Sequence, residues 1–365
     1  MATKGKRLGW KEFLLSLFLI IVLWATQEFL GIDLLDSGGS SVVNEPQGGI
    51  QVVFTAPLYP DEAANRSGGV DESLAMAIGG ALRSVDVAAY DFDLLRVADA
   101  LVAAQGRGVT VRLVTDTDYV DEAGTVHVAQ AGIPVITDDR DPFMHNKFVV
   151  IDEHLVWTGS CNLTNNGAYR NNNNIVMLES EALAENYTVE FEEMFTTQQF
   201  GASSPADTPH TEVKIGGTLV ENYFAPEEDI QSRIVALLEE AQSSIEFMAF
   251  VLTDNEISKV LSRKAREGVT VRGVVETRNV KGSGSDVEAL RTAGISVLAD
   301  GNPYVMHHKV IIIDGDVVIT GSYNFSRSAA EKNDENVLII HNSGIAADYA
   351  TEFQHVYQQA EEAAP

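Results

Sequence analysis

The chain has 365 residues and a formal net charge of −28, with 53 acidic against 25 basic side chains. Apolar residues make up 45% of it, which excludes wholesale disorder and allows one large domain or two ordinary ones. The negative field disfavours nucleic acid and anionic membranes as partners, except at a locally positive pocket. Acidic solvation of an exported or salt-adapted protein is the simpler interpretation of the charge. The single cysteine, Cys161, excludes an internal disulfide and offers no metal site.

A basic stretch followed by an apolar stretch opens the chain. Four Lys and Arg residues between positions 4 and 11 precede an apolar run from about Phe13 to Thr26, the pattern of a signal sequence or signal anchor. No small-x-small cleavage motif follows, so an uncleaved transmembrane segment over residues 1–30 is favoured over a cleaved signal and a secreted protein. A buried helix of a soluble protein is the alternative. The charges place the N-terminus in the cytoplasm and the body of the protein outside it, and residues 31–49, rich in Gly and Ser, predict a flexible tether.

The rest of the chain repeats one pattern. Residues 50–200 and 213–360 each alternate apolar strands with helices, and a Pro/Ser/Gly-rich linker at residues 201–212 joins them. Both halves carry the strand Val-Thr-Val-Arg, at 109–112 and at 269–272. The alternation predicts an α/β fold made of two duplicated α/β/α halves, each with a mostly parallel sheet. Aromatic residues at four-residue spacing near the end of each half are expected in the core.

Each half also carries the same polar motif. It reads H-x-K, four apolar residues and D, followed at a fixed distance by G-S-x-N. A single copy would be weak evidence, because a His and a Lys before a buried strand often occur by chance. Two copies 162 positions apart indicate a duplicated site, and the continuous apolar run predicts a central strand. The motif residues are His145, Lys147, Asp152, Ser160 and Asn162 in the first half and His307, Lys309, Asp314, Ser322 and Asn324 in the second.

These residue types are suited to phosphate chemistry. A His acts as a nucleophile or a proton donor near neutral pH, and Lys and Asn side chains hold phosphate oxygens. One copy of the motif supplies one His, whereas the reaction needs two with opposite roles.

On these two motifs the chain resembles the phospholipase D superfamily, from about Val52 to Tyr357. The resemblance implies cleavage of a phosphodiester through a phosphohistidine intermediate, without a metal ion or other cofactor. It also implies that the halves pack about a pseudo-twofold axis with both motifs at the interface. Within the family pattern His145 is the nucleophile and His307 protonates the leaving group.

The resemblance assigns the remaining motif residues as well. Lys147, Lys309, Asn162 and Asn324 are expected around the phosphate, and Ser160 and Ser322 are grouped with them as substrate-binding residues. Asp152 and Asp314 are included in the catalytic set, although residues that close their strands are expected to brace the site.

An acidic residue after the second motif commonly pairs with the His of its own half, and here that residue is Glu335. Its counterpart in the first half is Asn173, which leaves both orders of the two His roles open. His308 has no counterpart and is expected to be a bystander.

The favoured function is therefore a membrane-anchored phospholipase D-like phosphodiesterase acting on phospholipids. A phosphatidyltransferase of the cardiolipin synthase kind and a nuclease of the same superfamily are the alternatives within this chemistry. An inactive binding module at the cell surface is the non-enzymatic alternative. No cluster of His, Asp and Glu has metal-ligand spacing, so no metal site is predicted.

Overall fold

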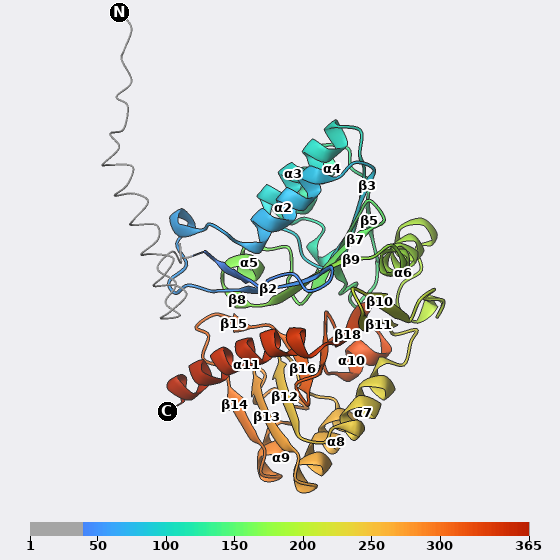
Figure 1. Ribbon diagram of the computed structural model, residues 1–365. Helices are drawn as coiled ribbons and strands as arrows, with labels where there is room; N and C mark the ends of the chain where they lie inside the picture. Colours follow the sequence, from blue (N-terminus) through green and yellow to red (C-terminus); the bar gives the residue numbers. More distant parts are fainter. Residues whose placement is uncertain (1–38, 365) are drawn as a thin grey trace, which may run out of the picture. The chain divides into compact units, whose positions relative to one another are not determined.

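The computed structural model describes residues 39–364, which form two mixed α/β halves (Figure 1). The expected transmembrane segment, residues 1–30, and residues 31–38 of the expected tether lie outside the described residues. Between residues 39 and 364, no helix has both the length and the hydropathy that a bilayer crossing requires.

The first half is built on an eight-stranded sheet with the strand order β1-β2-β9-β7-β6-β3-β4-β5. Its strands are β1 (Ser41–Val43), β2 (Ile50–Thr55), β3 (Ser84–Ala89), β4 (Thr110–Thr115), β5 (Val135–Thr137), β6 (Lys147–Ile151), β7 (Leu155–Gly159) and β9 (Asn174–Glu179). Its helical elements are η1 (Ala63–Asn65), α2 (Val70–Gly80), α3 (Leu95–Gly106), η2 (Thr117–Tyr119), α4 (Ala123–Gln130), α5 (Asn165–Tyr169), α6 (Glu181–Glu192) and the π-helical turn η3 (Glu193–Thr197). The motif strand β6 lies between β7 and β3 and is buried along its length, so the predicted central position is confirmed.

The second half repeats this arrangement in the order β10-β11-β18-β17-β16-β12-β13-β14. Its strands are β10 (Glu212–Ile215), β11 (Thr218–Ala225), β12 (Ser244–Ala249), β13 (Thr270–Val275), β14 (Ser296–Ala299), β16 (Lys309–Ile313), β17 (Val317–Gly321) and β18 (Glu335–His341). Its helices are α7 (Ile230–Glu240), α8 (Asn255–Arg266), α9 (Val287–Thr292), α10 (Arg327–Glu331) and α11 (Ser343–Ala363). The strands of the two sheets correspond position by position, as a duplication requires.

The prediction of mostly parallel sheets is wrong. In the first sheet β3, β4 and β5 run parallel, and the other neighbouring strands run antiparallel. The crossover helices α3 and α4 connect the parallel strands, whereas a tight turn at residues 152–154 joins β6 to β7. A connection this short permits only an antiparallel pair. The second sheet has the same pattern, with β12, β13 and β14 parallel.

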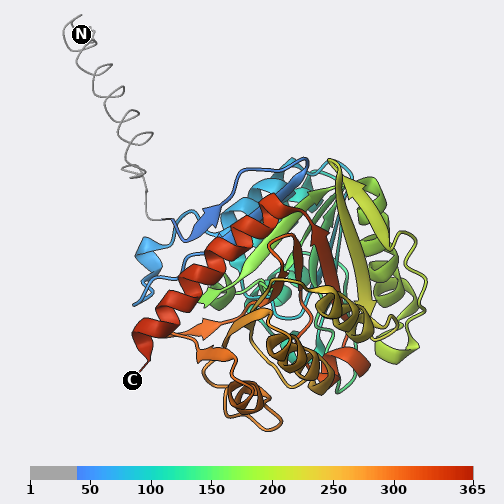
Figure 2. The same cartoon turned by 60° about the horizontal axis from the view of Figure 1, so that its bottom comes forward.

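Each sheet separates an outer core from one shared inner core. The helices α2 and α3 cover the outer face of the first sheet, and α7 and α8 cover that of the second. The helices α6 and α11 supply the inner core, and Figures 1 and 2 show α11 between the second sheet and β2 of the first. The predicted core aromatics are confirmed here, since Tyr187, Phe191, Tyr349 and Phe353 are completely buried. Full burial of such a side chain contributes about 1.5–3 kcal/mol, so these helices hold the halves together.

Two expected flexible segments contain ordered structure. Ser41–Val43 form β1 and pair with residues 53–55 of β2, so the expected tether is wrong for these residues. The β-branched pair Val42-Val43 favours this extended pairing. In the expected linker, Gly201–Ser203 form the 3₁₀ turn η4, and Glu212 already belongs to β10.

Candidate active site

The two H-x-K segments lie where two central strands begin. Lys147 is the first residue of β6 and Lys309 the first of β16, opposite the ends of β3 and β12. The backbone N–H of His145 donates to the carbonyl oxygen of Asp334 at 2.9 Å, and that of His307 donates to Asn172 at 2.9 Å. Each His is therefore fixed to a segment of the opposite half. The motifs meet at the interface between the halves, as the resemblance implies.

The His on each side is held by a residue of the other half. His145 Nδ1 lies 2.7 Å from Glu335 Oε2, and His307 Nδ1 lies 3.0 Å from Asn173 Oδ1. The expected pairing of Glu335 with His307 of its own half is therefore wrong. The reason is the crossed packing, which places the start of β18 beside the first motif through the isolated bridge between Met144 and Asp334.

Hydrogen bonds around the two partners fix how each His is oriented. Asn173 Nδ2 donates to Gly167 O at 3.0 Å, so Asn173 Oδ1 must be the atom that faces His307. An amide oxygen only accepts, so His307 donates through Nδ1 and directs Nε2 into the site. On the other side the carboxylate of Glu335 accepts from His145 Nδ1, which leaves His145 Nε2 with a free lone pair.

Ser160 and Ser322, expected to bind substrate, support these two partners. Ser160 Oγ donates to Asn173 Oδ1 at 2.9 Å, and Ser322 Oγ donates to Glu335 Oε2 at 2.7 Å. Both hydroxyls also accept a backbone N–H, so they are fully engaged within the protein. Their hydroxyls orient the residues that hold the His rings, and the substrate-binding role of the two Ser residues stays a prediction.

Burial sets the protonation behaviour of the site. It lowers the pKa of His145 and of His307 well below the usual imidazole range, and the nearby Lys side chains lower both further. Burial also raises the pKa of Glu335 to about 8, against the opposing effect of Lys147. All three groups lie almost entirely out of contact with water. A charge that develops on either ring therefore depends on its protein partner for stabilisation.

Two Lys side chains point into the same buried space. Lys147 Nζ donates to His145 O at 2.8 Å and lies over the Tyr90 ring, while Lys309 Nζ donates to His307 O at 2.9 Å. Burial lowers the pKa of Lys147 to about 7, and burial together with Lys147 lowers that of Lys309 well below its usual range. Burial and the mutual repulsion of the two amines disfavour their charged forms. An anion such as a phosphate would restore both charges.

Asn162 and Asn324 follow β7 and β17 at this edge of the sheets. Their Oδ1 atoms are buried, and neither has a hydrogen-bond partner among residues 39–364. Buried polar atoms nearly always have a partner. These two side chains are therefore free to reorient toward a bound group.

Asp152 and Asp314 lie away from the site, at the far ends of the motif strands. Asp152 accepts the backbone N–H groups of Leu82, Arg83 and Ser84, and Asp314 accepts the three equivalent ones at 242–244. Burial alone would raise the pKa of these carboxyls, but the three backbone donors lower it overall. Inclusion of the two Asp residues in the catalytic set is therefore wrong. They brace the turn before β3 and before β12, in line with the expected bracing role.

A clamp that the sequence interpretation missed joins the halves beside His145. The guanidinium of Arg140 forms an ion pair with the buried carboxylate of Asp334, which also accepts the Gly201 N–H. The pseudo-equivalent contact beside His307 is uncharged, with Asn302 Nδ2 donating to Asn172 Oδ1. At the offset of 162 positions Arg140 corresponds to Asn302 and Asp334 to Asn172, so a comparison of the two halves would have shown this difference. Charged groups thus gather on the His145 side and amides on the His307 side.

A second set of buried hydrogen bonds, which the sequence interpretation missed, lies behind the motifs. His308 is completely buried between Asn174 Oδ1, at 3.2 Å, and Glu352 Oε1, at 3.1 Å. Its counterpart Asn146 is held in the same way by Asn336 and Glu190. The expectation that His308 is a bystander is wrong, because it links the second motif to α11 and to the first half.

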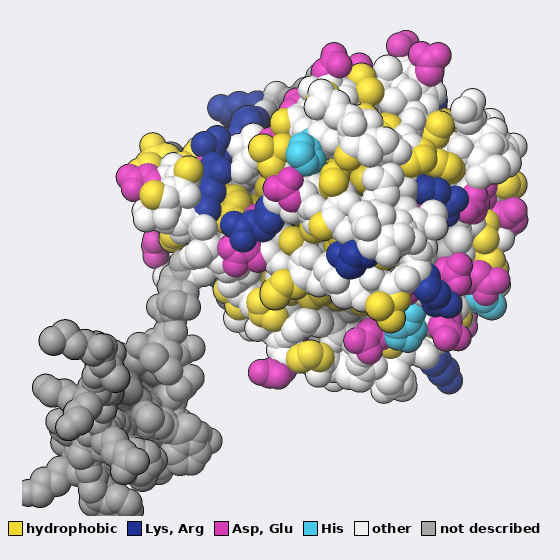
Figure 3. Space-filling view, turned by 90° about the horizontal axis from the view of Figure 1, so that it is seen from above, with side chains coloured by type: hydrophobic (Ala, Val, Ile, Leu, Met, Phe, Trp, Pro, Cys, Tyr) yellow, Lys and Arg dark blue, Asp and Glu magenta, His cyan; other side chains and the backbone are white. Residues whose placement is uncertain are grey.

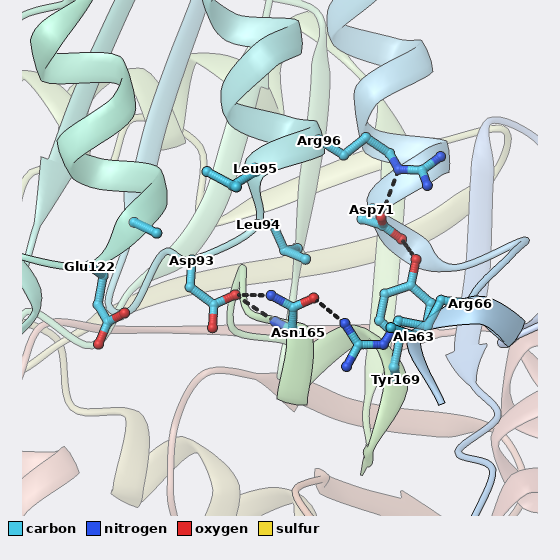
Figure 4. A pocket seen from close by; sticks show the side chains of 11 residues that line it. Ala63, Arg66, Asp71, Asp93, Leu94, Leu95, Arg96, Glu122, Asn165 and Tyr169 are labelled. Atoms are coloured by element: carbon cyan, nitrogen blue, oxygen red, sulfur yellow. Dashed lines mark hydrogen bonds and ion pairs between the residues drawn. The ribbon is translucent and has the colours of Figure 1, made fainter. Parts of the chain in front are cut away.

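A cavity of about 510 Å³, lined by both apolar and charged side chains, opens on the first half near this edge (Figure 4). Its wall includes Asp93, whose Oδ1 accepts from the backbone and side chain of Asn165, and Asn165 in turn accepts from Arg66. Asp93 and Asn165 follow β3 and β7, as the site residues Tyr90 and Asn162 do. The cavity therefore lies beside the candidate active site and contains neither His.

Comparison with known proteins identifies the family. The family model described as cardiolipin synthase, phospholipase D-like domain matches residues 74–195 and 234–357, more than half of the chain and both motifs. The chain belongs to the phospholipase D superfamily. The phosphatidylserine synthase of Haemophilus influenzae has a similar fold, with a TM-score of 0.60 and 12% identity over 80% of this chain and 84% of that one.

Relatives with higher identity match one half of the chain. The mitochondrial cardiolipin hydrolase of Xenopus tropicalis is 35% identical over 128 residues, which are 35% of this chain and 61% of that protein. A phospholipase D of Rickettsia prowazekii is 33% identical over 162 residues, 44% of this chain and 79% of that protein. The chain thus aligns with less than two thirds of the length of the first relative and with most of the second.

Within the described residues, no group of three or more His, Cys, Asp or Glu side chains is placed to hold a metal ion. The polar groups of the site are instead two imidazoles, two amines, amides and one carboxyl, which suit an anionic ligand.

Proposed function

We propose that the protein is a phospholipase D-type phosphodiesterase in which His145 attacks phosphorus and His307 serves the leaving group. The observation that carries this order of roles is the crossed pairing of the two rings. A carboxylate faces Nδ1 of His145, whereas a neutral amide faces Nδ1 of His307. The ring that must carry a positive charge in a covalent intermediate is the one that has the carboxylate.

In the first step, the lone pair of His145 Nε2 forms a bond to phosphorus while the bond from phosphorus to the leaving alcohol oxygen breaks. His307 acts here as the doubly protonated imidazolium, a form that the bound phosphate anion favours, and the leaving oxygen takes the proton from its Nε2. In the second step, a water molecule gives a proton to His307 and its oxygen attacks phosphorus. The P–N bond then breaks and its electrons return to His145.

The phosphorylated ring has substituents on both nitrogens and therefore carries a positive charge. With Nδ1–H directed at Glu335, this charge meets a carboxylate at hydrogen-bond distance in a buried site. Charge-assisted hydrogen bonds of this kind are roughly twice as strong as neutral ones. The leaving-group acid needs the opposite property, a proton that departs easily, and the amide of Asn173 does not hold that proton back.

Lys147 and Lys309 are proposed to neutralise the phosphate oxygens. Asn162 and Asn324 are proposed to donate their amide N–H groups to the same oxygens. Such preorganised donors stabilise the charge that builds up in the five-coordinate transition state.

A phospholipid is the proposed substrate class. The relatives named phospholipase D and cardiolipin hydrolase support this choice, and the net charge of −28 opposes a nucleic acid. A phosphatidyl transfer to an alcohol is the second candidate, favoured by the description of the family model as cardiolipin synthase. In that reaction an alcohol replaces water in the second step.

The body of the protein is proposed to act outside the cytoplasm, held to a membrane by the segment within residues 1–30. This proposal rests on the basic and apolar pattern of that segment. The full chain should sediment with membranes. Recovery of the unprocessed chain in the soluble fraction would contradict the anchor.

The proposed activity is tested by offering the full chain phospholipids, DNA and a soluble diester, with release of the alcohol or nucleotide as the readout. Phospholipid turnover that is lost in both His145→Ala and His307→Ala is the expected result. Turnover of DNA alone would contradict the proposed substrate class. Activity should also persist in EDTA, because no step in the proposed mechanism uses a metal ion. Loss of activity on chelation that a specific divalent ion restores would contradict that mechanism.

A further inference from the structure

Four large apolar side chains are exposed on two neighbouring segments of the first half. Their exposed fractions are 53% for Val42, 54% for Val43, 50% for Leu58 and 70% for Tyr59. We propose that these four residues, called the apolar rim below, contact the surface of a lipid bilayer while the site acts on a phospholipid. The proposal rests on the phospholipid substrate proposed above and adds the surface by which the site reaches it.

The two segments are joined by backbone hydrogen bonds. Residues 41–43 of β1 pair with the end of β2, and the N–H of Ala56 donates to Ser40 O at 2.8 Å. Leu58 lines the same small recess as Ser40. The backbone pairing therefore holds the two segments side by side, although they come from two stretches of sequence.

The apolar rim lies at the active-site edge of the sheets. The Tyr59 ring is centred 5.4 Å from the Tyr304 ring, and the N–H of Asp61 donates to the Tyr304 hydroxyl at 2.7 Å. Tyr304 is three residues before His307, in the segment that connects β14 to the second motif. A bilayer against the rim would thus lie beside the segment that carries one of the two His residues.

Ion pairs brace the segment that follows Tyr59 and leave little net charge behind the apolar rim. Asp61 accepts from Arg66 at 2.6 Å and from Arg170 at 2.8 Å, and these guanidinium groups stack on Tyr169 and Tyr304. Such pairing matters because the acidic surface as a whole opposes approach to anionic lipid. Figure 3, which looks onto the first half, shows exposed apolar side chains scattered among Lys, Arg, Asp and Glu side chains.

The point at which the described residues begin supports a lipid bilayer as the partner of the apolar rim. Ser40 is bonded through its backbone to Ser67 and to Ala56, so the chain enters the fold at the rim itself. The predicted membrane segment ends at residue 30, and the eight residues 31–38 that follow can span at most about 29 Å. An anchored chain would therefore hold the apolar rim close to the membrane. Tyr and aliphatic side chains are residue types that partition into the interfacial zone of a bilayer.

The matched test compares the rim with an exposed apolar residue elsewhere. Leu82 is 83% exposed, and its backbone binds Asp152 at the opposite edge of the sheet from the two His residues. The full chain and its Tyr59→Ser, Leu58→Ser and Leu82→Ser variants are assayed on phosphatidylcholine vesicles and on a short-chain monomeric phosphodiester.

Leu58→Ser and Tyr59→Ser combined in one chain should lower kcat/KM on vesicles on the order of tenfold or more, from the lost apolar contact. Turnover of the monomeric diester should stay unchanged, and Leu82→Ser should match the parent on both substrates. An equal loss on both substrates, or no loss on vesicles, would overturn the proposal. A change of oligomeric state in the rim variants with full vesicle activity would overturn it in favour of a second copy of the chain as the occupant.

A second measurement separates this proposal from the proposed activity. Cys161 is completely buried, so a cysteine introduced by Tyr59→Cys can be labelled selectively with a polarity-sensitive dye. Vesicles should shift the emission of the dye at position 59 to shorter wavelength and leave that of a Leu82→Cys control unchanged. This readout needs no turnover, so a shift without any phosphodiesterase activity would support the rim and contradict the proposed function. The absence of a shift at position 59 would contradict the rim.

Discussion

The carboxylate of Glu335 should accelerate attack by His145, and Glu335→Gln tests this directly. The substitution keeps the size of the side chain and a carbonyl oxygen for Ser322 Oγ, but it removes the group that can become negative when the ring of His145 becomes positive. It makes the environment of His145 resemble that of His307, which already has an amide partner.

The expected size of the effect follows from the contacts at Oε2. A buried hydrogen bond to a charged group contributes about 1.5–3 kcal/mol, against about 1 kcal/mol for a neutral pair. Loss of the attraction between the phosphorylated ring and the carboxylate adds to this difference, while the two Lys side chains already screen part of that attraction. Together these effects predict a loss of about 2–3 kcal/mol, or roughly 30- to 150-fold in the rate of phosphoenzyme formation.

The assay is rapid-quench measurement of phosphoenzyme formation from a diester with a p-nitrophenyl leaving group. Such a group leaves without protonation, so the reaction reports on the nucleophile alone. The matched control is Asn173→Ala, which perturbs the partner of His307 and should stay within a few-fold of the parent. A large loss in Asn173→Ala together with a normal rate in Glu335→Gln would refute the assigned order of roles.

Three further predictions concern the clamp, the strand-end carboxylates and the pH response of the site. Arg140→Ala should lower the free energy of unfolding by about 3–5 kcal/mol in urea titrations, because it leaves the buried Asp334 carboxylate unpaired. The control Asn302→Ala should cost only about 1 kcal/mol, and equal losses would contradict a special role for the ion pair. Asp152→Asn should lower the free energy of unfolding by about 1–2 kcal/mol and leave kcat unchanged. Since folding lowers the pKa of Asp152, the difference in stability between variant and parent should vanish as pH falls through that pKa. A loss of kcat at unchanged stability would contradict a bracing role. Binding of a non-hydrolysable phosphodiester should weaken between pH 7 and pH 9. The reason is that Lys147 loses its positive charge near pH 7 and Glu335 gains a negative charge near pH 8. A constant or rising affinity over this range, measured by calorimetry, would contradict these protonation states.

The sequence predicts the duplicated halves and the central motif strands, and both follow from patterns with a local physical cause. The meeting of the two motifs at the interface is what the family resemblance implies. A continuous apolar run such as residues 148–151 must be buried on both faces, and a repeat spaced 162 positions apart must fold twice in the same way.

Strand direction could not be read from the same patterns. An apolar run predicts a buried strand whether its neighbours are parallel or antiparallel. The short connection at residues 152–154 was the available signal, since adjacent strands joined by so few residues cannot be parallel.

The crossed pairing of the two His residues was beyond the sequence for a different reason. Glu335 and His145 are 190 positions apart, and their contact exists only because the halves pack face to face. Side-chain roles within a motif were equally hidden. Ser160 and Asp152 stand in the same motif as His145, but Ser160 supports Asn173 and Asp152 braces a turn at the other end of β6.

The central claim is that two half-sites build one active site in which His145 is the nucleophile. The most direct measurement traps the phosphoenzyme from a labelled diester and maps the label by mass spectrometry in the parent, His145→Ala and His307→Ala chains. Label is expected on His145 in the parent, nowhere in His145→Ala, and again on His145 in His307→Ala when the leaving group needs no proton. Label on His307, or full activity in either single variant, would contradict the central claim.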